Sequence, residues 1–425
     1  MSKETKEIKA GIKAHFIQTD LFKTNLVCVF ITVPLTRENV TKNALIPFIL
    51  KSGSKILPTQ YLINEKMESL YGANFECGVD KLGDNQVFKF YIDAINNEYA
   101  LENEDILKET IDSLLDIVFN PVLEKDKFKK EFIDIEKENL KTIIDSKIDD
   151  KDMYAYDRCI SEMYNNKNFG IYKYGYEEDL EKIDENNLTE HYNYLIQNSK
   201  IDIYISGKYD INKVQTDIME NENIKKLKPR IENYILNNEY TESKQNVDNI
   251  KEITEKMEVT QGKLVIGLDV VSNIENLQCV SLVYNAILGD GASSMLFQNV
   301  REKAGLAYSA RSNYIKQKAN IFIRCGIQIE NFEKALNIVK DQLENMKKGN
   351  FTDEDIENAK KYLIAGIKTI EEEQDSEVIF YIGQEIAKTN RTVKEYIELI
   401  EKVKRDEILE IAKAVQINTI YFLRD

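Results

Sequence analysis

The chain has 425 residues, of which 43% are apolar and 31% charged, and its formal net charge is −16 at pH 7. One hydrophobic core cannot serve a chain of this length, so the length predicts two to four domains of roughly 100–200 residues. The acidic balance argues against nucleic acid and against an anionic membrane surface as partners, because both attract basic patches.

The beginning of the chain lacks the features of a targeting segment. Residues 1–16 contain no apolar run of signal-peptide length, and the longest apolar run, residues 26–33, is interrupted by Thr32 and far shorter than a membrane span. Even the nearest two cysteines, Cys279 and Cys325, are 46 residues apart, which excludes a CxxC motif and predicts reduced, mostly buried thiols. We therefore expect a cytoplasmic protein that does not contact a membrane.

The first half opens with a series of four elements. Residues 26–33 predict a strand and residues 43–54 an apolar helix. Residues 63–75 predict a helix that ends in Gly72, and residues 85–94 alternate as a strand does.

The second half repeats this series of strand, apolar helix, helix ending in glycine, and strand. One offset of 233 residues carries Gly72 to Gly305 and Phe75 to Tyr308. The repeated elements are residues 262–271, 276–289, 296–309 and 319–328. A fixed offset over a whole supersecondary unit indicates an internal duplication.

Each half then becomes helical and closes on a short strand, at residues 200–207 and 418–425. Strands and helices that do not alternate strictly predict an α+β fold, in which helices cover one face of a mainly antiparallel sheet. The polar, weakly periodic segment 222–260 predicts a linker with at most a short helix. We thus expect two homologous lobes, residues 1–221 and 261–425, joined by this linker.

Two classes of site are poorly supported by the sequence. The two histidines, His15 on a predicted strand and His191 on a predicted helix, are 176 residues apart, which excludes any motif that needs two nearby histidines. We expect both to be satisfied structural or surface residues. The segment GDGASS at 289–294 lacks the lysine of a phosphate-binding loop, so it predicts a turn between helices.

The segment GDGASSMLFQNVREKAGLAYSARS, residues 289–312, resembles the second-domain signature of the M16 metallopeptidases, the group of insulinase, the mitochondrial processing peptidase and pitrilysin. The resemblance covers nearly the whole chain, because the duplicated lobes, the linker and their order agree. It implies a clamshell whose lobes enclose an unfolded peptide. It also implies a zinc ion held in the first lobe by an HxxEH helix and by a glutamate further along the chain.

This sequence departs from the family at the zinc helix. Pro47 and Lys51 take the places of the two histidines, and Leu50 takes the place of the catalytic glutamate. A catalytic zinc needs three protein ligands and a nearby carboxylate as general base, which these side chains cannot supply. Glu131 and Glu138 are seven residues apart on one helix face, and Glu138 fits the third-ligand position. A solvated acidic helix would also contain such a pair.

Arg301 and Tyr308 match the Arg/Tyr pair with which the second lobe of the family contacts substrate near the scissile bond. A guanidinium and a phenol can donate several hydrogen bonds to peptide carbonyls and to a developing oxyanion. The alternative is structural: Arg301 pairs with Glu302 or Glu330 on the surface, and Tyr308 packs in the core.

The resemblance predicts a non-catalytic, peptide-binding subunit of a heterodimeric M16 zinc peptidase. This chain would supply the Arg/Tyr pair, and an HxxEH-bearing homologue would supply the zinc, so no cofactor is expected here. One alternative is a structural or peptide-holding M16-like scaffold protein without peptidase activity. Another is a metallopeptidase with unusual ligands, such as Glu131, Glu138 and His15.

Overall fold

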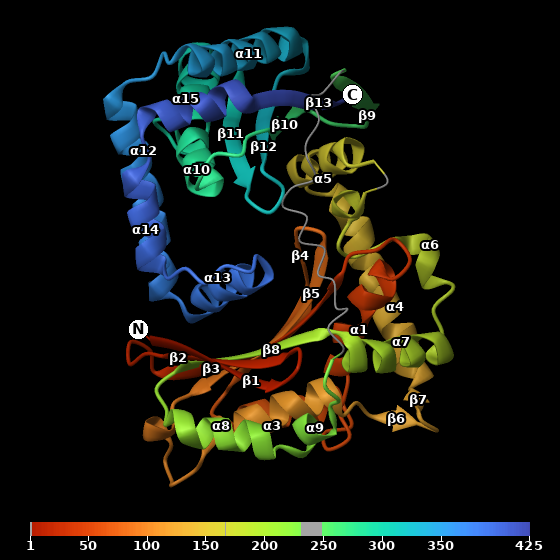
Figure 1. Cartoon of the computed structure of the whole chain (residues 1–425). Helices are drawn as coiled ribbons and strands as arrows, with labels where there is room; N and C mark the ends of the chain where they lie inside the picture. Colours follow the sequence, from red (N-terminus) through yellow and green to blue (C-terminus); the bar gives the residue numbers. More distant parts are fainter. Residues whose placement is uncertain (1, 166, 231–248) are drawn as a thin grey trace. The chain divides into compact units, whose positions relative to one another are not determined.

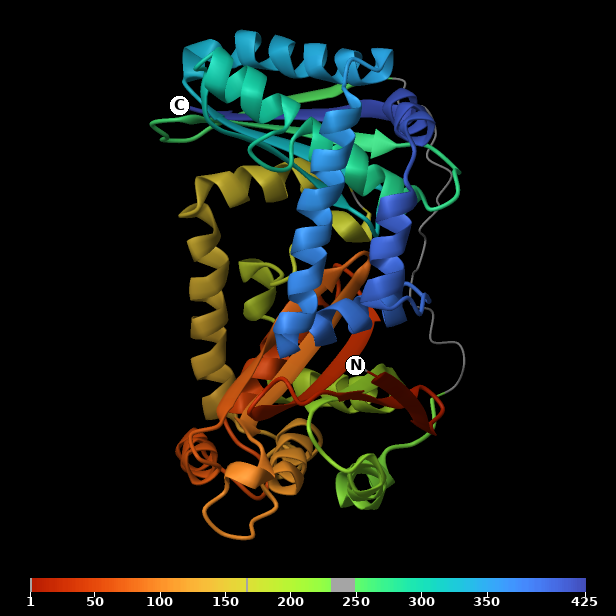
Figure 2. The same ribbon diagram turned by 90° about the vertical axis from the view of Figure 1, so that its left-hand side faces the viewer.

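The structure is a computed structural model that describes residues 2–165, 167–230 and 249–425. The chain divides into two compact units, each with its own sheet (Figures 1 and 2). Unit 1 comprises Met1–Asp145, Ile171–Asn238 and Glu372–Ile386. Unit 2 comprises Ser146–Gly170, Glu239–Glu371 and Ala387–Asp425. Both units therefore draw on both halves of the sequence.

The sheet of unit 1 has the strand order β1-β2-β8-β3-β5-β4 among the described residues. Within it β2 and β8 pair in parallel, and the other neighbouring strands pair antiparallel. The central strand β3 is buried along most of its length, which explains why its sequence reads as one apolar run. The strands are β1 (Ser2–Lys9), β2 (Ile12–Gln18), β3 (Thr24–Pro34), β4 (Asn74–Leu82), β5 (Asn85–Ile95) and β8 (Lys200–Gly207).

Helices pack on one face of this sheet, where alternate strand residues such as Val27, Val29 and Ile31 form a core with α1 and α3. The opposite face carries α13 (Gln374–Ile386), which comes from the second half of the sequence (Figure 1). The other elements of unit 1 are α1 (Val40–Lys51), α2 (Gln60–Ser69), α3 (Ile106–Phe119), α4 (Lys130–Asp145), α6 (Glu177–Leu180), α7 (Glu185–Asn198), α8 (Ile211–Glu220), α9 (Glu222–Lys226) and the short pair β6 (Leu123–Glu124) and β7 (Lys127–Phe128).

The sheet of unit 2 has the order β11-β12-β10-β13-β9 among the described residues, with β9 and β13 parallel. The face opposite its own helices carries α5 (Lys151–Met163), which comes from the first half of the sequence. The strands are β9 (Lys251–Lys256), β10 (Gly262–Val270), β11 (Ala307–Ile315), β12 (Asn320–Ile327) and β13 (Val415–Arg424), and the remaining helices are α10 (Leu277–Leu288), α11 (Phe332–Lys348), α12 (Asp353–Lys368), α14 (Val393–Lys402) and α15 (Arg405–Ala414).

The structure confirms the predicted α+β fold and the duplication. The two strand orders correspond when β2, β8, β3, β5 and β4 are placed on β9, β13, β10, β12 and β11. Gly72 and Gly305, related by the sequence offset, have φ of +76° and +63° with open space where a Cβ would be. Glycine is therefore needed at both turns for its backbone and not for close packing.

The predicted linker, residues 222–260, begins with the short helix α9 and includes strand β9 near its end. Its middle part, residues 231–248, lies outside the described residues. Where the chain leaves α9, Arg230 is 5% exposed, and its guanidinium donates to the carbonyls of Ile196 and Ser199 at the C-terminal end of α7.

Candidate functional site

The residues predicted to replace the zinc motif, Pro47, Leu50 and Lys51, lie on α1, which is buried on nearly all sides. Leu50, predicted at the place of the catalytic glutamate, is 0% exposed, and Pro47 is also buried. The Pro47 carbonyl accepts a hydrogen bond from the Cys77 thiol on β4 at 3.3 Å. Lys51 is half-buried and carries an ammonium group, which cannot coordinate a cation. This helix therefore has neither a ligand set for zinc nor a carboxylate open to a substrate.

Glu131 and Glu138 lie on α4 and are both exposed. The carboxylate that the structure brings to the end of α1 is instead Glu136, which accepts a hydrogen bond from the Ser52 hydroxyl at 3.1 Å. Glu136 could not be singled out from the sequence, because a helix with so many acidic residues gives no signal for any one of them. Among the described residues, no group of three or more His, Cys, Asp and Glu side chains could hold a metal ion.

Both histidines make the internal contacts expected of structural residues. Nε2 of His191 lies 2.7 Å from Oδ1 of Asn43 on α1, and burial lowers the pKa of His191 to about 4. His15 on β2 is 0% exposed, with Nε2 3.0 Å from an oxygen of Asp202 and Nδ1 2.9 Å from the Thr5 hydroxyl. Burial lowers the pKa of His15, and Asp202 opposes this only in part. Both ring nitrogens of His15 are thus already engaged.

Arg301 lies in a π-helical segment, Phe297–Lys303, where the sequence predicts the end of an ordinary helix. Its guanidinium stands over the ring of Phe297, 4.6 Å from the centroid, and Nε is 3.6 Å from a carboxylate oxygen of Glu302. The Arg301 side chain is 43% exposed, so the contact with Glu302 is a weak surface pair. The predicted left-handed position is confirmed at Gly305, whose N–H donates to the Arg301 carbonyl.

Tyr308 begins the strand β11, which lies at an edge of the unit 2 sheet among the described residues. The pairing with β12 steps from Ala307 opposite Ile327 to Ser309 opposite Gly326, so Tyr308 is the extra residue of a β-bulge. Its side chain is 72% exposed, and its phenol has no hydrogen-bond partner in the part of the chain that the structure describes. The alternative interpretation of Tyr308 as a core residue is therefore wrong.

Arg301 and Tyr308 both sit where the backbone departs from regular structure. π-Helical turns and β-bulges interrupt the regular backbone hydrogen bonding of a helix or a sheet. Both are frequent next to functional sites, where they change the direction in which side chains point. The sequence could reveal the motif and the glycine, but a single sequence carries no signal for a bulge or a π-turn. The stacking of Phe297 under Arg301 was predictable in principle, because four residues separate them on a helix.

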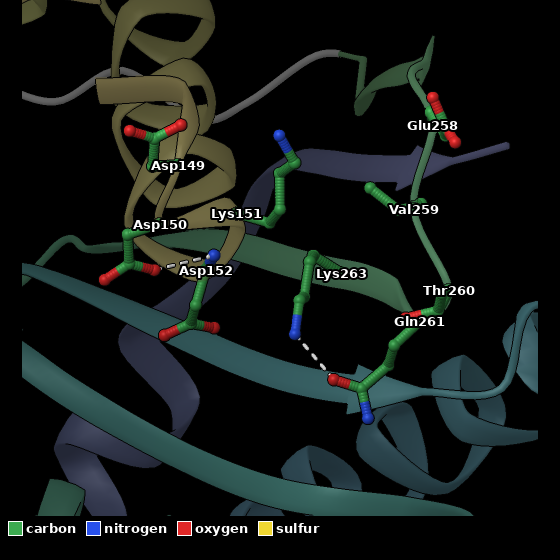
Figure 3. Close-up of a pocket in the computed structure, with 9 residues that line it drawn as sticks. All are labelled: Asp149, Asp150, Lys151, Asp152, Glu258, Val259, Thr260, Gln261 and Lys263. Carbon is green, nitrogen blue, oxygen red and sulfur yellow. Dashed lines mark hydrogen bonds between the residues drawn. The ribbon is translucent and has the colours of Figure 1, made fainter. Parts of the chain in front are cut away.

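Unit 2 also contains an open pocket of about 740 Å³ between the start of α5 and the chain that enters β10 (Figure 3). Asp149 and Glu258 stand on opposite walls, with Lys151 between them (Figure 3). Asp152 pairs with Arg311 at 2.8 Å and lies 3.4 Å from Arg324. The lining consists of Asp149, Asp150, Lys151, Asp152, Glu258, Val259, Thr260, Gln261 and Lys263.

This pocket was not foreseen from the sequence, because its two walls are about a hundred residues apart in the chain. Its acidic groups are balanced by the two lysines of the lining and by the nearby arginines, so it does not select a ligand by charge. It borders the bulge: a Cβ on Gly326 would come within 2.8 Å of the Gln261 side-chain oxygen and 3.2 Å of the Ser309 hydroxyl.

Comparison with known proteins identifies the family to which this chain belongs. Residues 182–363 match the model of the peptidase M16 inactive domain. Over 423 residues the chain is 32% identical to the probable inactive metalloprotease YmfF of Bacillus subtilis strain 168, and the match covers 99% of this chain and 97% of that protein. This chain belongs to the peptidase M16 family.

Solved structures agree with this assignment. A conserved protein from Enterococcus faecalis V583 matches with a TM-score of 0.89 and 26% identity, over 100% of this chain and 99% of that one. The peptidase M16 inactive domain from Pseudomonas fluorescens matches with a TM-score of 0.78 over 100% of this chain and 98% of its own. At 14% identity, this second match shows the fold alone.

In the part of the chain that the structure describes, no helix combines the length and the apolar character needed to cross a bilayer.

Proposed function

We propose that this M16 protein is a non-catalytic, peptide-binding subunit that works with an HxxEH-bearing homologue. In this proposal the homologue holds zinc and performs hydrolysis, while Arg301 and Tyr308 of this chain contact the peptide. The observation that carries the proposal is the exposure of both side chains on a π-helical turn and a β-bulge. The bulge is not explained by packing of the Tyr308 ring, because that side chain is not part of the core.

The chemistry of the pair suits an extended peptide. The Arg301 guanidinium offers a planar set of N–H donors, and the Tyr308 hydroxyl can donate one more hydrogen bond to a carbonyl oxygen. Strand β11 lies at a sheet edge, so its outer backbone groups can pair with a peptide that lies alongside. When such donors meet the oxyanion of a transition state, each contributes about 10²–10³ in rate.

The scaffold alternative predicts no such requirement. A protein that only assembles with others needs no hydrogen-bond donors held ready at an edge strand. The exposed phenol of Tyr308 therefore favours a peptide-binding protein over a purely structural scaffold.

Reconstitution tests the proposal. The purified chain is mixed with its HxxEH homologue, and cleavage of an unfolded peptide is followed with Arg301→Ala and Tyr308→Phe variants. We expect no cleavage by this chain alone, activity in the mixture, and a loss of about tenfold or more for each variant. Two controls match the changes: Lys303→Ala on the same turn, and Tyr194→Phe on α7, where the tyrosine is 64% exposed. Equal activity of all four mixtures would contradict the proposal.

A further inference from the structure

Each sheet carries one helix from the other half of the sequence, and the two helices dock in a comparable way. Both α5 and α13 are 13 residues long. In each unit a fully buried tyrosine marks the middle of the covered face: Tyr204 on β8 and its counterpart Tyr421 on β13. The parallel neighbour of Tyr204 is His15 on β2, and that of Tyr421 is Ile253 on β9. These strand pairings make each position on the covered face of one sheet equivalent to a position on the covered face of the other.

One contact between sheet and helix occurs at equivalent positions in both units. Two residues before His15 lies Lys13, and two residues before Ile253 lies Lys251. Lys13 binds Glu385, the twelfth residue of α13, with an N–O distance of 2.5 Å. Lys251 binds Glu162, the twelfth residue of α5, also at 2.5 Å. Because both helices carry a glutamate at this position and both sheets a lysine, this contact cannot tell the two helices apart.

A second contact differs between the units. Two residues after Ile253 lies Glu255, which accepts from Nε of Arg158, the eighth residue of α5, at 2.9 Å. The hydroxyls of Tyr154 and Tyr421 also donate to Glu255, at 2.6 and 2.8 Å. This carboxylate is therefore surrounded by donors that α5 and the sheet supply together.

The residue at the corresponding register position in unit 1 is not a carboxylate. Two residues after His15 lies the apolar Ile17, whose neighbour on β1 is Lys3. The eighth residue of α13 is Tyr381, and the Lys3 ammonium stands 4.6 Å from the centroid of its ring. A cation over an aromatic ring is favourable, whereas two cations at this distance repel each other.

We propose that the eighth residue of each exchanged helix selects the sheet on which that helix docks. Arg158 fits unit 2, where Glu255 accepts it, and is rejected by unit 1, where it would face Lys3 above Ile17. Tyr381 fits unit 1 and would leave Glu255 without its guanidinium in unit 2. The duplicated chain thus avoids placing α5 and α13 on the wrong sheets during folding.

The experiment reverses the charge that rejects α5. The full chain carrying Lys3→Glu is unfolded in urea and refolded by dilution, and the recovery of native monomer is measured by size-exclusion chromatography. Because the wrong contact becomes attractive, the proportion of misfolded or associated chains should rise about tenfold. The matched control is Lys6→Glu, which makes the same charge change three residues along β1. This control should refold like the unaltered protein.

A triple variant separates selection from stability. Lys3→Glu is combined with Arg158→Glu and Glu255→Arg, which keeps an ion pair in unit 2 and restores repulsion in unit 1. We expect the triple variant to recover native monomer as the unaltered protein does. Equal recovery of Lys3→Glu and Lys6→Glu would overturn the proposal, and so would a triple variant that refolds no better than Lys3→Glu.

Discussion

Replacing Leu50 by glutamate puts a carboxyl group at the predicted position of the catalytic glutamate, where the side chain is 0% exposed. The change forfeits about 2 kcal/mol of apolar burial. It also places a carboxyl group where burial raises its pKa by about two to three units above 4.3. Since each unit corresponds to about 1.4 kcal/mol, the charge adds a penalty of roughly 3–4 kcal/mol at pH 7. The total loss of about 5–6 kcal/mol is a large share of the stability of a domain.

The control is Leu50→Gln, because glutamine has nearly the same shape as glutamate but carries no charge. The free energy of unfolding is measured by urea titration with far-UV circular dichroism between pH 4 and 8. A carboxyl whose pKa is raised in the folded state costs nothing below the unfolded pKa of about 4.3, and its cost grows as the pH rises above that value. The glutamate variant should therefore match the glutamine variant at about pH 4 and be less stable by roughly 3–4 kcal/mol at pH 7. Equal stabilities of the two variants at pH 7 would mean that the side chain at position 50 faces solvent, which would contradict its burial in the structure.

Three further predictions concern the partly buried His191, the turn at Gly305 and Gly366 in α12. Because the pKa of His191 falls to about 4 in the folded state, protonation of the unfolded chain should reduce the free energy of unfolding by up to about 3 kcal/mol as the pH falls from 6.5 towards 4. His191→Gln should remove that part of the pH dependence, and an unchanged pH profile would refute the assignment. Gly305→Ala should destabilise the protein by about 1–2 kcal/mol, since φ is +63° there. Gly366→Ala, inside α12 with open space around the new methyl group, should instead stabilise it by about 0.5–1 kcal/mol in the same denaturation assay.

Much of the fold was predictable because its signals are local. The apolar run at residues 26–33 and the alternation at 85–94 correspond to β3 and β5, and the segment 200–207 coincides with β8. The offset that relates Gly72 to Gly305 predicted the duplication before any packing was known. By contrast, the periodicity of residues 151–163 predicts a helix but does not specify the sheet on which it packs. That choice depends on contacts such as Arg158 with Glu255, which are remote in sequence.

The candidate site was predictable only in part. The family resemblance predicts which residues of α1 replace the zinc motif, and the glycine turn indicates the place of Arg301. The exposure of Tyr308 does not follow from the sequence, because an aromatic residue on a strand usually packs. The exposure of Tyr308 depends on the extra residue in β11, and this bulge is seen only in the pairing of β11 with β12. Glu136 could not be chosen over Glu131 and Glu138, because only the packing of α4 against Ser52 distinguishes them.

The most direct test of the account is the zinc content of the complex between this chain and its HxxEH homologue. We expect this chain alone to retain no stoichiometric zinc, and the complex to hold one zinc ion per pair. That ion should be lost when the histidines of the homologue are replaced and retained when Glu131 and Glu138 of this chain become glutamine. One tightly bound zinc ion per molecule of this chain alone would contradict the account.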